Sequence, residues 1–94
     1  MQKNLTHTII NTMKLFVKNI DRDINEMQLE ALFKQFGEVV STKIVYDKIT
    51  WESKGFGFVE MGTKTEAYKA IDKLNGIEIK GRPLSVEIAI DKPR

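Results

Sequence analysis

The chain has almost none of two residue types, cysteine and histidine, that are common in metal sites and active sites. It has no cysteine, which excludes disulfide bonds, thiolate metal sites and cysteine nucleophiles together. Its one histidine, His7, stands in a polar stretch without a second metal-ligating side chain nearby, so we expect it to face solvent. We therefore expect neither a metal nor a cofactor. No grouping of base, nucleophile and ligand residues indicates an enzyme.

Long hydrophobic runs and a strong net charge are also missing. No apolar run is long enough to span a membrane or to form the core of a signal peptide. The net charge of +2 permits a polyanionic partner without requiring one, so the placement of the charges matters more than their sum. We expect an intracellular protein without a membrane partner, in the cytoplasm, with the nucleus as the alternative location.

What is present is enough for one small domain. A length of 94 residues and a hydrophobic content of 41% are typical of a single globular unit. Residues 1–12 are mostly polar and predict a flexible leader. Residues 13–90 predict the domain, which we expect to be monomeric, and residues 91–94 predict a tail.

The stretch Lys54–Met61 carries the most information. Alternate side chains of a strand point to opposite faces, so Phe56 and Phe58 share one face, and two glycines, a valine and a methionine share the other. The second face suits a core that another element approaches closely. The two rings are then left on the open face and need a partner there. A register slip of one residue would instead make them ordinary core.

The stretch Lys14–Asn19 repeats this pattern. Phe16 stands between Lys14 and Lys18 on one face, and two aliphatic side chains take the other. Both stretches therefore predict strands that present aromatic rings and cations away from the core.

Two segments between the strands have helix signals at both ends. Each begins with a capping box, carries an apolar stripe at helical spacing and closes at a glycine. The capping boxes are Asn25 with Gln28 and Thr63 with Glu66, and the closing glycines are Gly37 and Gly76. Alternating residues predict the remaining strands over 39–47 and 84–89, with a short hairpin segment at 77–81.

The resulting order, βαββαβ, predicts an α+β protein with a ferredoxin-like fold. Right-handed crossovers place both helices on one face of a four-stranded antiparallel sheet. The first and third strands become central neighbours, so we expect Phe16 beside Phe56 and Phe58 on the uncovered face.

At this point the residues resemble those of an RNA recognition motif. Lys54–Met61 is similar to the longer ribonucleoprotein motif of that family and departs from it only at Met61, where an aromatic residue is usual. Leu15–Ile20 resembles the shorter motif, with Lys18 in place of a frequent glycine. The resemblance covers residues 14–89. It implies binding of single-stranded RNA, with single-stranded DNA as an alternative.

The resemblance also assigns roles on the open face. Phe16 and Phe58 would stack on two successive bases, Phe56 would lie against the sugars between them, and Lys54 would reach a phosphate. Other cations would extend the positive field, although each of them could equally be part of a solvated face. They are Lys14, Lys18, Lys43 and Arg82.

Three residues leave alternatives open. Trp51, in the loop between the second and third strands, could stack on a base or pack against its own loop. Glu60 and Glu87 share the open face by alternation. A carboxylate there repels phosphate, but it can also accept hydrogen bonds from base N–H groups.

Two other function classes compete with RNA binding. A protein-interaction module is the alternative, because some members of the family bind peptides through an Arg-x-Phe loop. The corresponding segment here, Arg82-Pro83-Leu84, lacks the aromatic residue. An enzyme on the same fold, such as an acylphosphatase, would need catalytic groups that the sequence does not group together.

Overall fold

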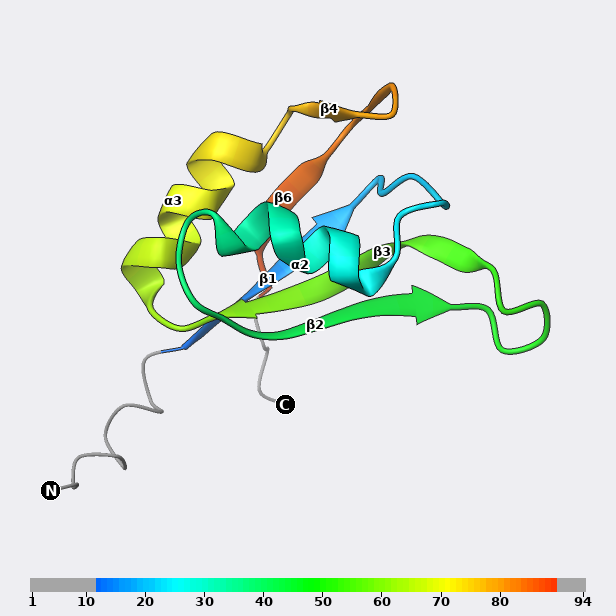
Figure 1. Ribbon diagram of the computed structural model, residues 1–94, viewed down its shortest axis with the longest axis horizontal. Coiled ribbons are helices and arrows are strands. Elements are labelled where there is room, and N and C mark those ends of the chain that lie inside the picture. The colour runs from blue at the N-terminus through cyan, green and yellow to red at the C-terminus, as the bar shows by residue number, and fades with distance from the viewer. Residues whose placement is uncertain (1–11, 90–94) are drawn as a thin grey trace, which may run out of the picture.

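The computed structural model describes residues 12–89 (Figure 1). The expected tail, most of the expected leader and His7 lie outside these residues. The elements are β1 (Met13–Lys18), α2 (Glu26–Lys34), β2 (Val39–Tyr46), β3 (Ser53–Met61), α3 (Lys64–Leu74), β4 (Glu78–Ile79), β5 (Arg82–Pro83) and β6 (Ser85–Ile88).

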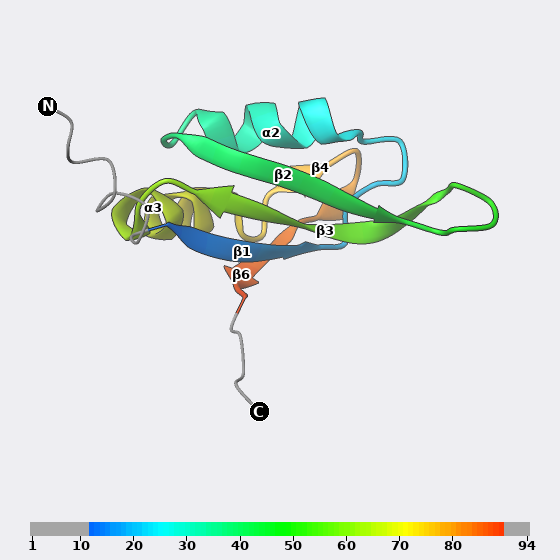
Figure 2. The same ribbon diagram turned by 90° about the horizontal axis from the view of Figure 1, so that it is seen from below.

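The sheet has the topology that the sequence predicts. Its strand order is β2-β3-β1-β6, all neighbours are antiparallel, and β1 and β3 are therefore the central pair. The small strands β4 and β5 form a separate hairpin before β6. Figure 2 shows α2 on one side of the sheet and the β2–β3 hairpin extending beyond its end. The ferredoxin-like βαββαβ fold is confirmed.

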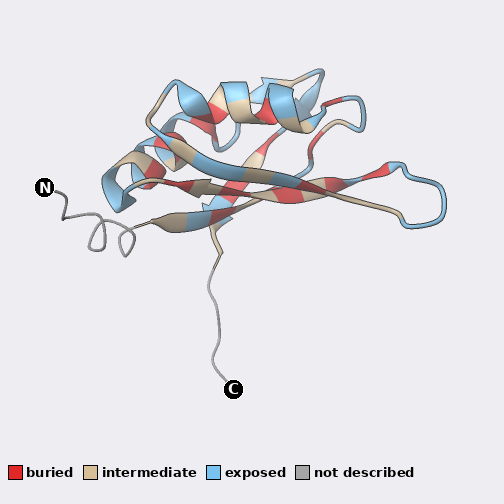
Figure 3. Cartoon of the chain, turned by 60° about the horizontal axis from the view of Figure 1, so that its bottom comes forward, coloured by how far each residue is buried: buried red, intermediate tan, exposed pale blue. Residues whose placement is uncertain are grey.

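The core lies between the sheet and the two helices. The central strands contribute Leu15, Val17 and Val59, all fully buried, and the helices contribute Leu29 and Phe33 from α2 and three further residues from α3. Burial alternates along β3, as expected for a strand with one face in the core (Figure 3). The predicted strand parity is therefore correct, and the register slip is excluded.

The two helix starts differ in one respect from the prediction. Asn25 and Gln28 form the complete capping box of α2. In α3 the Thr63 hydroxyl accepts a hydrogen bond from the Glu66 N–H, but the Glu66 carboxylate accepts instead from the backbone N–H of Glu38. Glu66 thus ties α3 to the turn before β2 rather than closing its own cap.

The end of α2 comes earlier than its apolar stripe suggests. The helix ends at Lys34 with Gln35 as C-cap, and Phe36 follows in the turn while still packing against the core. The turn continues through Gly37 into β2.

Two glycines of β3 permit close approach of neighbouring backbone. Gly55 has a φ of +82°, a conformation that favours glycine, and its carbonyl oxygen accepts a hydrogen bond from the Ile20 N–H at 2.9 Å. A side chain at Gly57 would collide with the carbonyl oxygen of Lys43 on β2. The close approach that the sequence predicts on this face is present.

Candidate nucleic-acid interface

Three rings form an aromatic platform on the sheet face opposite the helices, consisting of Phe16, Phe56 and Phe58. The centroids of Phe16 and Phe58 are 5.1 Å apart with their planes 16° from parallel, and Phe56 meets Phe16 edge-on at 5.8 Å. All three rings are half-buried, whereas their strand neighbours on the other face are buried. The predicted meeting of two distant segments on one open face is confirmed.

The strand register places four residues in one row across this face. Lys43 on β2 is opposite Phe58 on β3, Phe58 is opposite Phe16 on β1, and Phe16 is opposite Glu87 on β6. Residues directly opposite each other in a sheet lie on the same face with closely spaced side chains. From β2 to β6, the row therefore consists of a cation, two aromatic rings and a carboxylate.

Two lysines of β1 lie over the rings. The Lys14 ammonium is 5.9 Å from the centroid of Phe58, and the Lys18 ammonium is 5.5 Å from that of Phe16. Lys18 Nζ also lies 3.6 Å from Glu87 Oε2 in an ion pair whose side chains are about half exposed. Both lysines must leave the ring faces before a flat ligand can stack there.

The second carboxylate of the open face has a different partner. Glu60 is opposite Lys14 in the register, and its Oε2 accepts a hydrogen bond from the Thr12 hydroxyl at 2.7 Å. Thr12 received no role from sequence reasoning, and nothing in the residues preceding β1 marks it.

Two other cations were expected on this face, Lys54 and Arg82. Lys54 is exposed, whereas Arg82 contacts other side chains of the protein. Lys54 is exposed on β3, on the same face as Phe56. Arg82 Nη1 donates to Asn19 Oδ1 at 3.3 Å, and its Nε lies 3.9 Å from Asp21 Oδ2. Arg82 therefore links the β4–β5 hairpin to the loop after β1.

Asn19 is a structural residue that sequence reasoning missed. It has a φ of +59°, and its side-chain amide donates to the Pro83 carbonyl oxygen at 2.8 Å. The available signal was its residue type, because asparagine directly after a strand tolerates the left-handed conformation better than most residues.

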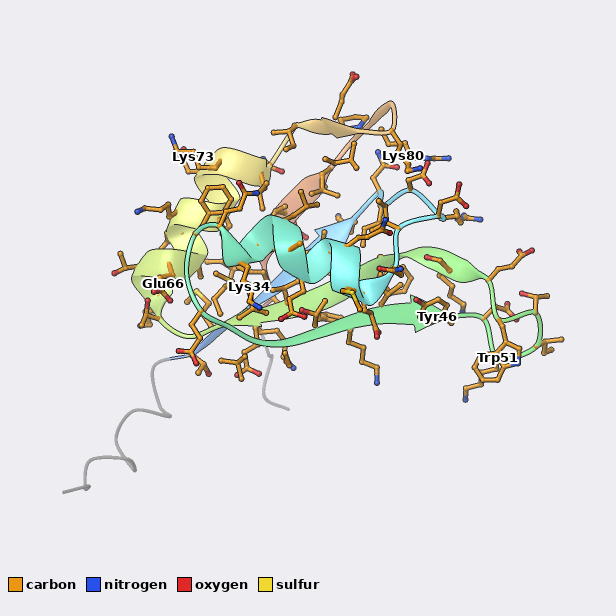
Figure 4. All side chains as sticks on the ribbon, in the orientation of Figure 1. Lys34, Tyr46, Trp51, Glu66, Lys73 and Lys80 are labelled. Atoms are coloured by element: carbon orange, nitrogen blue, oxygen red, sulfur yellow. The ribbon has the colours of Figure 1, made fainter. Side chains whose placement is uncertain are left out.

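Trp51 lies at the tip of the β2–β3 hairpin (Figure 4). It is 74% exposed and, with Tyr46 and Arg22 among others, lines a hollow of about 410 Å³. Tyr46 is paired with the buried Ser53, so it faces the helix side of the sheet.

The loop that carries Trp51 is organised by Asp47. One carboxylate oxygen of Asp47 accepts hydrogen bonds from the N–H groups of Ile49 and Thr50 at 2.8 and 3.0 Å. The Asp47 backbone adds bonds to Trp51 and Glu52. The Thr50 N–H, then the Ile49 N–H, and more weakly the charge of Lys54 hold the pKa of the Asp47 carboxyl below its usual value.

The described residues show neither of two other kinds of site. Within 12–89 no group of three or more histidine or acidic side chains is arranged to hold a metal ion. No helix in the same range is long and apolar enough to cross a membrane.

The fold and the platform together define a small α+β domain with an exposed, cation-edged aromatic sheet face. The family model of the RNA recognition motif matches residues 15–85. The chain belongs to the RNA recognition motif family.

Individual relatives agree with this family. The chain is 42% identical over 82 residues to a 29 kDa chloroplastic ribonucleoprotein of Arabidopsis thaliana, covering 87% of this chain and 24% of that protein. It is 40% identical to a 28 kDa chloroplastic ribonucleoprotein of Spinacia oleracea, covering 86% and 35%. The chain thus spans about a quarter to a third of the length of these curated relatives.

Solved structures agree as well. The crystal structure of RNA binding protein PG1 superposes with a TM-score of 0.81 at 38% identity, covering 87% of this chain and 99% of that one. A chain of the SXL-lethal protein/RNA complex superposes with a TM-score of 0.78 at 37% identity, covering 82% and 47%.

Proposed function

We propose that the open face of the sheet binds single-stranded RNA. The observation that carries this proposal is the pair of near-parallel rings, Phe16 and Phe58, on the sheet face opposite the two helices of the described residues (Figure 2). Flat bases stack on such rings with about 1–3 kcal/mol per base. Membership in the family and the ribonucleoprotein names of the relatives support the same function.

The rings and the lysines of the open face have proposed tasks. Phe16 and Phe58 stack on two successive bases, Phe56 lies against the sugars between them, and Lys54 and Lys43 contact phosphates. Lys14 exchanges its cation–π contact for a phosphate contact when bases arrive, and Lys18 also leaves the face of its ring. The free energy of two or three stacked bases must also offset the entropy lost when the RNA strand becomes ordered. We therefore expect a dissociation constant in the micromolar range.

The predicted contacts of Trp51 and Arg82 need further conditions. Trp51 contacts RNA only if the bound RNA extends from the platform to the tip of the β2–β3 hairpin. Arg82 reaches RNA only if it releases Asn19 and Asp21. Single-stranded DNA lacks the 2′-hydroxyl but offers the same bases and phosphates, so we expect weaker binding of DNA rather than none.

The wider setting of the module also belongs to the proposal. The relatives carry chloroplastic names, which gives no support to the cytoplasmic location expected from the sequence, although both are intracellular. We propose a monomer without catalytic activity, because stacking and phosphate contacts require neither a second copy nor a reacting group.

The test removes the rings and measures binding. Phe56→Ala/Phe58→Ala should abolish binding of short oligonucleotides, measured by fluorescence anisotropy, while far-UV circular dichroism and thermal unfolding show a folded protein. Tyr68→Ala is the matched control, since Tyr68 is a 52% exposed aromatic residue on α3. Unchanged binding in the double variant would show that the platform is not the site.

An NMR titration distinguishes RNA binding from the alternative of a protein-interaction module. Amide chemical shifts should move on β1 and β3 when RNA is added. Shifts confined to α2 and α3 with a peptide, and none on the sheet with RNA, would favour a protein-binding module.

A further inference from the structure

The two rings of the row have different charged neighbours. Phe58 has Lys43 on its outer side, and Phe16 has Glu87. Because side chains directly opposite each other are about 4.5–5.5 Å apart at Cβ, a base on Phe16 would have the carboxylate along its edge. A base on Phe58 would have a cation there instead.

Glu87 does not stand alone at this edge. Lys18 Nζ lies 3.6 Å from its Oε2 and 5.5 Å from the centroid of Phe16. The two side chains are 46% and 53% exposed, and an ion pair so exposed is weak, so it separates at little cost. When a base stacks on Phe16, Lys18 moves off the ring face. Its N–H donors then lie next to the Glu87 acceptors at the edge of the base.

This edge of the site has a defined hydrogen-bonding pattern of one cationic donor beside two carboxylate acceptors. Guanine carries the complementary pattern on one edge, with the acceptor O6 beside the donors N1–H and N2–H. Adenine, cytosine and uracil each offer a carboxylate only one donor group on that edge. A carboxylate that accepts two parallel hydrogen bonds makes the stronger and more directional contact.

We propose that the base stacked on Phe16 is selected as guanine, with Glu87 accepting from N1–H and N2–H and Lys18 donating to O6. This inference rests on the proposed RNA binding and names the base that one of its two stacking sites prefers. The site on Phe58 makes no such selection, because its cross-strand neighbour Lys43 offers donors only and the Glu60 carboxylate is engaged by the Thr12 hydroxyl.

The selection also explains a carboxylate on a face that meets phosphates. At a base edge, the Glu87 carboxylate accepts hydrogen bonds from base N–H groups. These hydrogen bonds offset the repulsion between its negative charge and the RNA backbone. Its pairing with Lys18 keeps it from facing the strand as an isolated charge.

The experiment uses uridine hexamers with one central position changed to guanosine, adenosine, cytidine or inosine, bound to the whole chain at fixed salt. The guanosine oligonucleotide should bind about tenfold more tightly than the adenosine one. Inosine, which lacks the 2-amino group, should lose several-fold relative to guanosine because one of the two donors is gone.

Glu87→Gln tests the residue. The guanosine preference should fall to within about twofold, while the other oligonucleotides bind as well as before or more tightly, because a negative charge has left the face. Glu60→Gln is the matched control. It removes the same charge from the same face, opposite Lys14, and should keep the preference.

The outcomes separate the two proposals. Equal binding of all bases, a preference for another base, or a guanosine preference that survives Glu87→Gln overturns the selection and leaves RNA binding intact. Loss of the preference in both variants also overturns it, because the effect would then be one of general charge. Absence of binding to every oligonucleotide overturns both proposals.

Discussion

Phe16 and Phe58 stack on each other across the two central strands, with centroids 5.1 Å apart. Their interaction is part of the free protein and precedes any ligand. An aromatic pair of this kind contributes about 0.5–1.5 kcal/mol beyond the area it buries. The same two rings therefore stabilise the sheet and offer the binding surface.

This stacking predicts coupled effects on stability. In a double-mutant cycle by urea unfolding, Phe16→Ala and Phe58→Ala should show an interaction of about 0.5–1.5 kcal/mol. Phe16→Ala combined with Tyr68→Ala should be additive, because Tyr68 is a 52% exposed residue of α3 and Phe16 lies on the sheet face opposite the helices. An additive result for the Phe16 and Phe58 pair would mean that the stacking does not stabilise the fold.

Gly57 should be intolerant of any side chain. Its Cβ would meet the backbone of Lys43, which is fixed in the sheet, so Gly57→Ala should lower the free energy of unfolding by about 1–3 kcal/mol. Gly62→Ala is the control, since there the nearest atoms belong to the flexible Glu38 side chain. Denaturant unfolding of both variants checks this, and equal losses would contradict the backbone clash.

Lys43 should act through charge alone. Four phosphate contacts to a single strand give a slope of about −3 in a plot of log affinity against log salt, and Lys43→Gln should reduce its magnitude by about 0.7. The loss should be uniform across bases, because a phosphate contact carries no sequence information. Lys73→Gln, on the exposed side of α3, should leave the slope unchanged; an equal change there would indicate only a bulk charge effect.

Asp47 should make the hairpin loop sensitive to acid. Hydrogen bonds from the Thr50 and Ile49 N–H groups lower its pKa below the usual 3.8, so the stabilisation is fully present above that value. It is lost as the pH falls through the lower pKa of the folded state. A carboxyl carbon NMR titration should give a midpoint below 3.8, and Asp47→Asn should loosen the loop at neutral pH. A midpoint at or above 3.8 would contradict this account.

Much of the fold could be predicted because its local signals are consistent. Alternation along Lys14–Asn19 and Lys54–Met61 defined which side chains share a face, and the capping residues Asn25 and Thr63 marked both helix starts. The order of the elements then predicted the ferredoxin-like arrangement, in which the two strands that carry the aromatic residues are neighbours. The prediction failed where a side chain had a non-local partner, as with Glu66, whose carboxylate binds the turn before β2.

The sequence by itself determined which residues face the open side of the sheet, because strand alternation is a property of the local backbone. Only the tertiary structure decided their partners. The register across three strand pairs put Glu87 beside Phe16 and Lys43 beside Phe58, and it paired Lys18 with Glu87. Alternation along one strand determines the face that a side chain takes, whereas the residue that it meets across the sheet depends on how strands far apart in the sequence align.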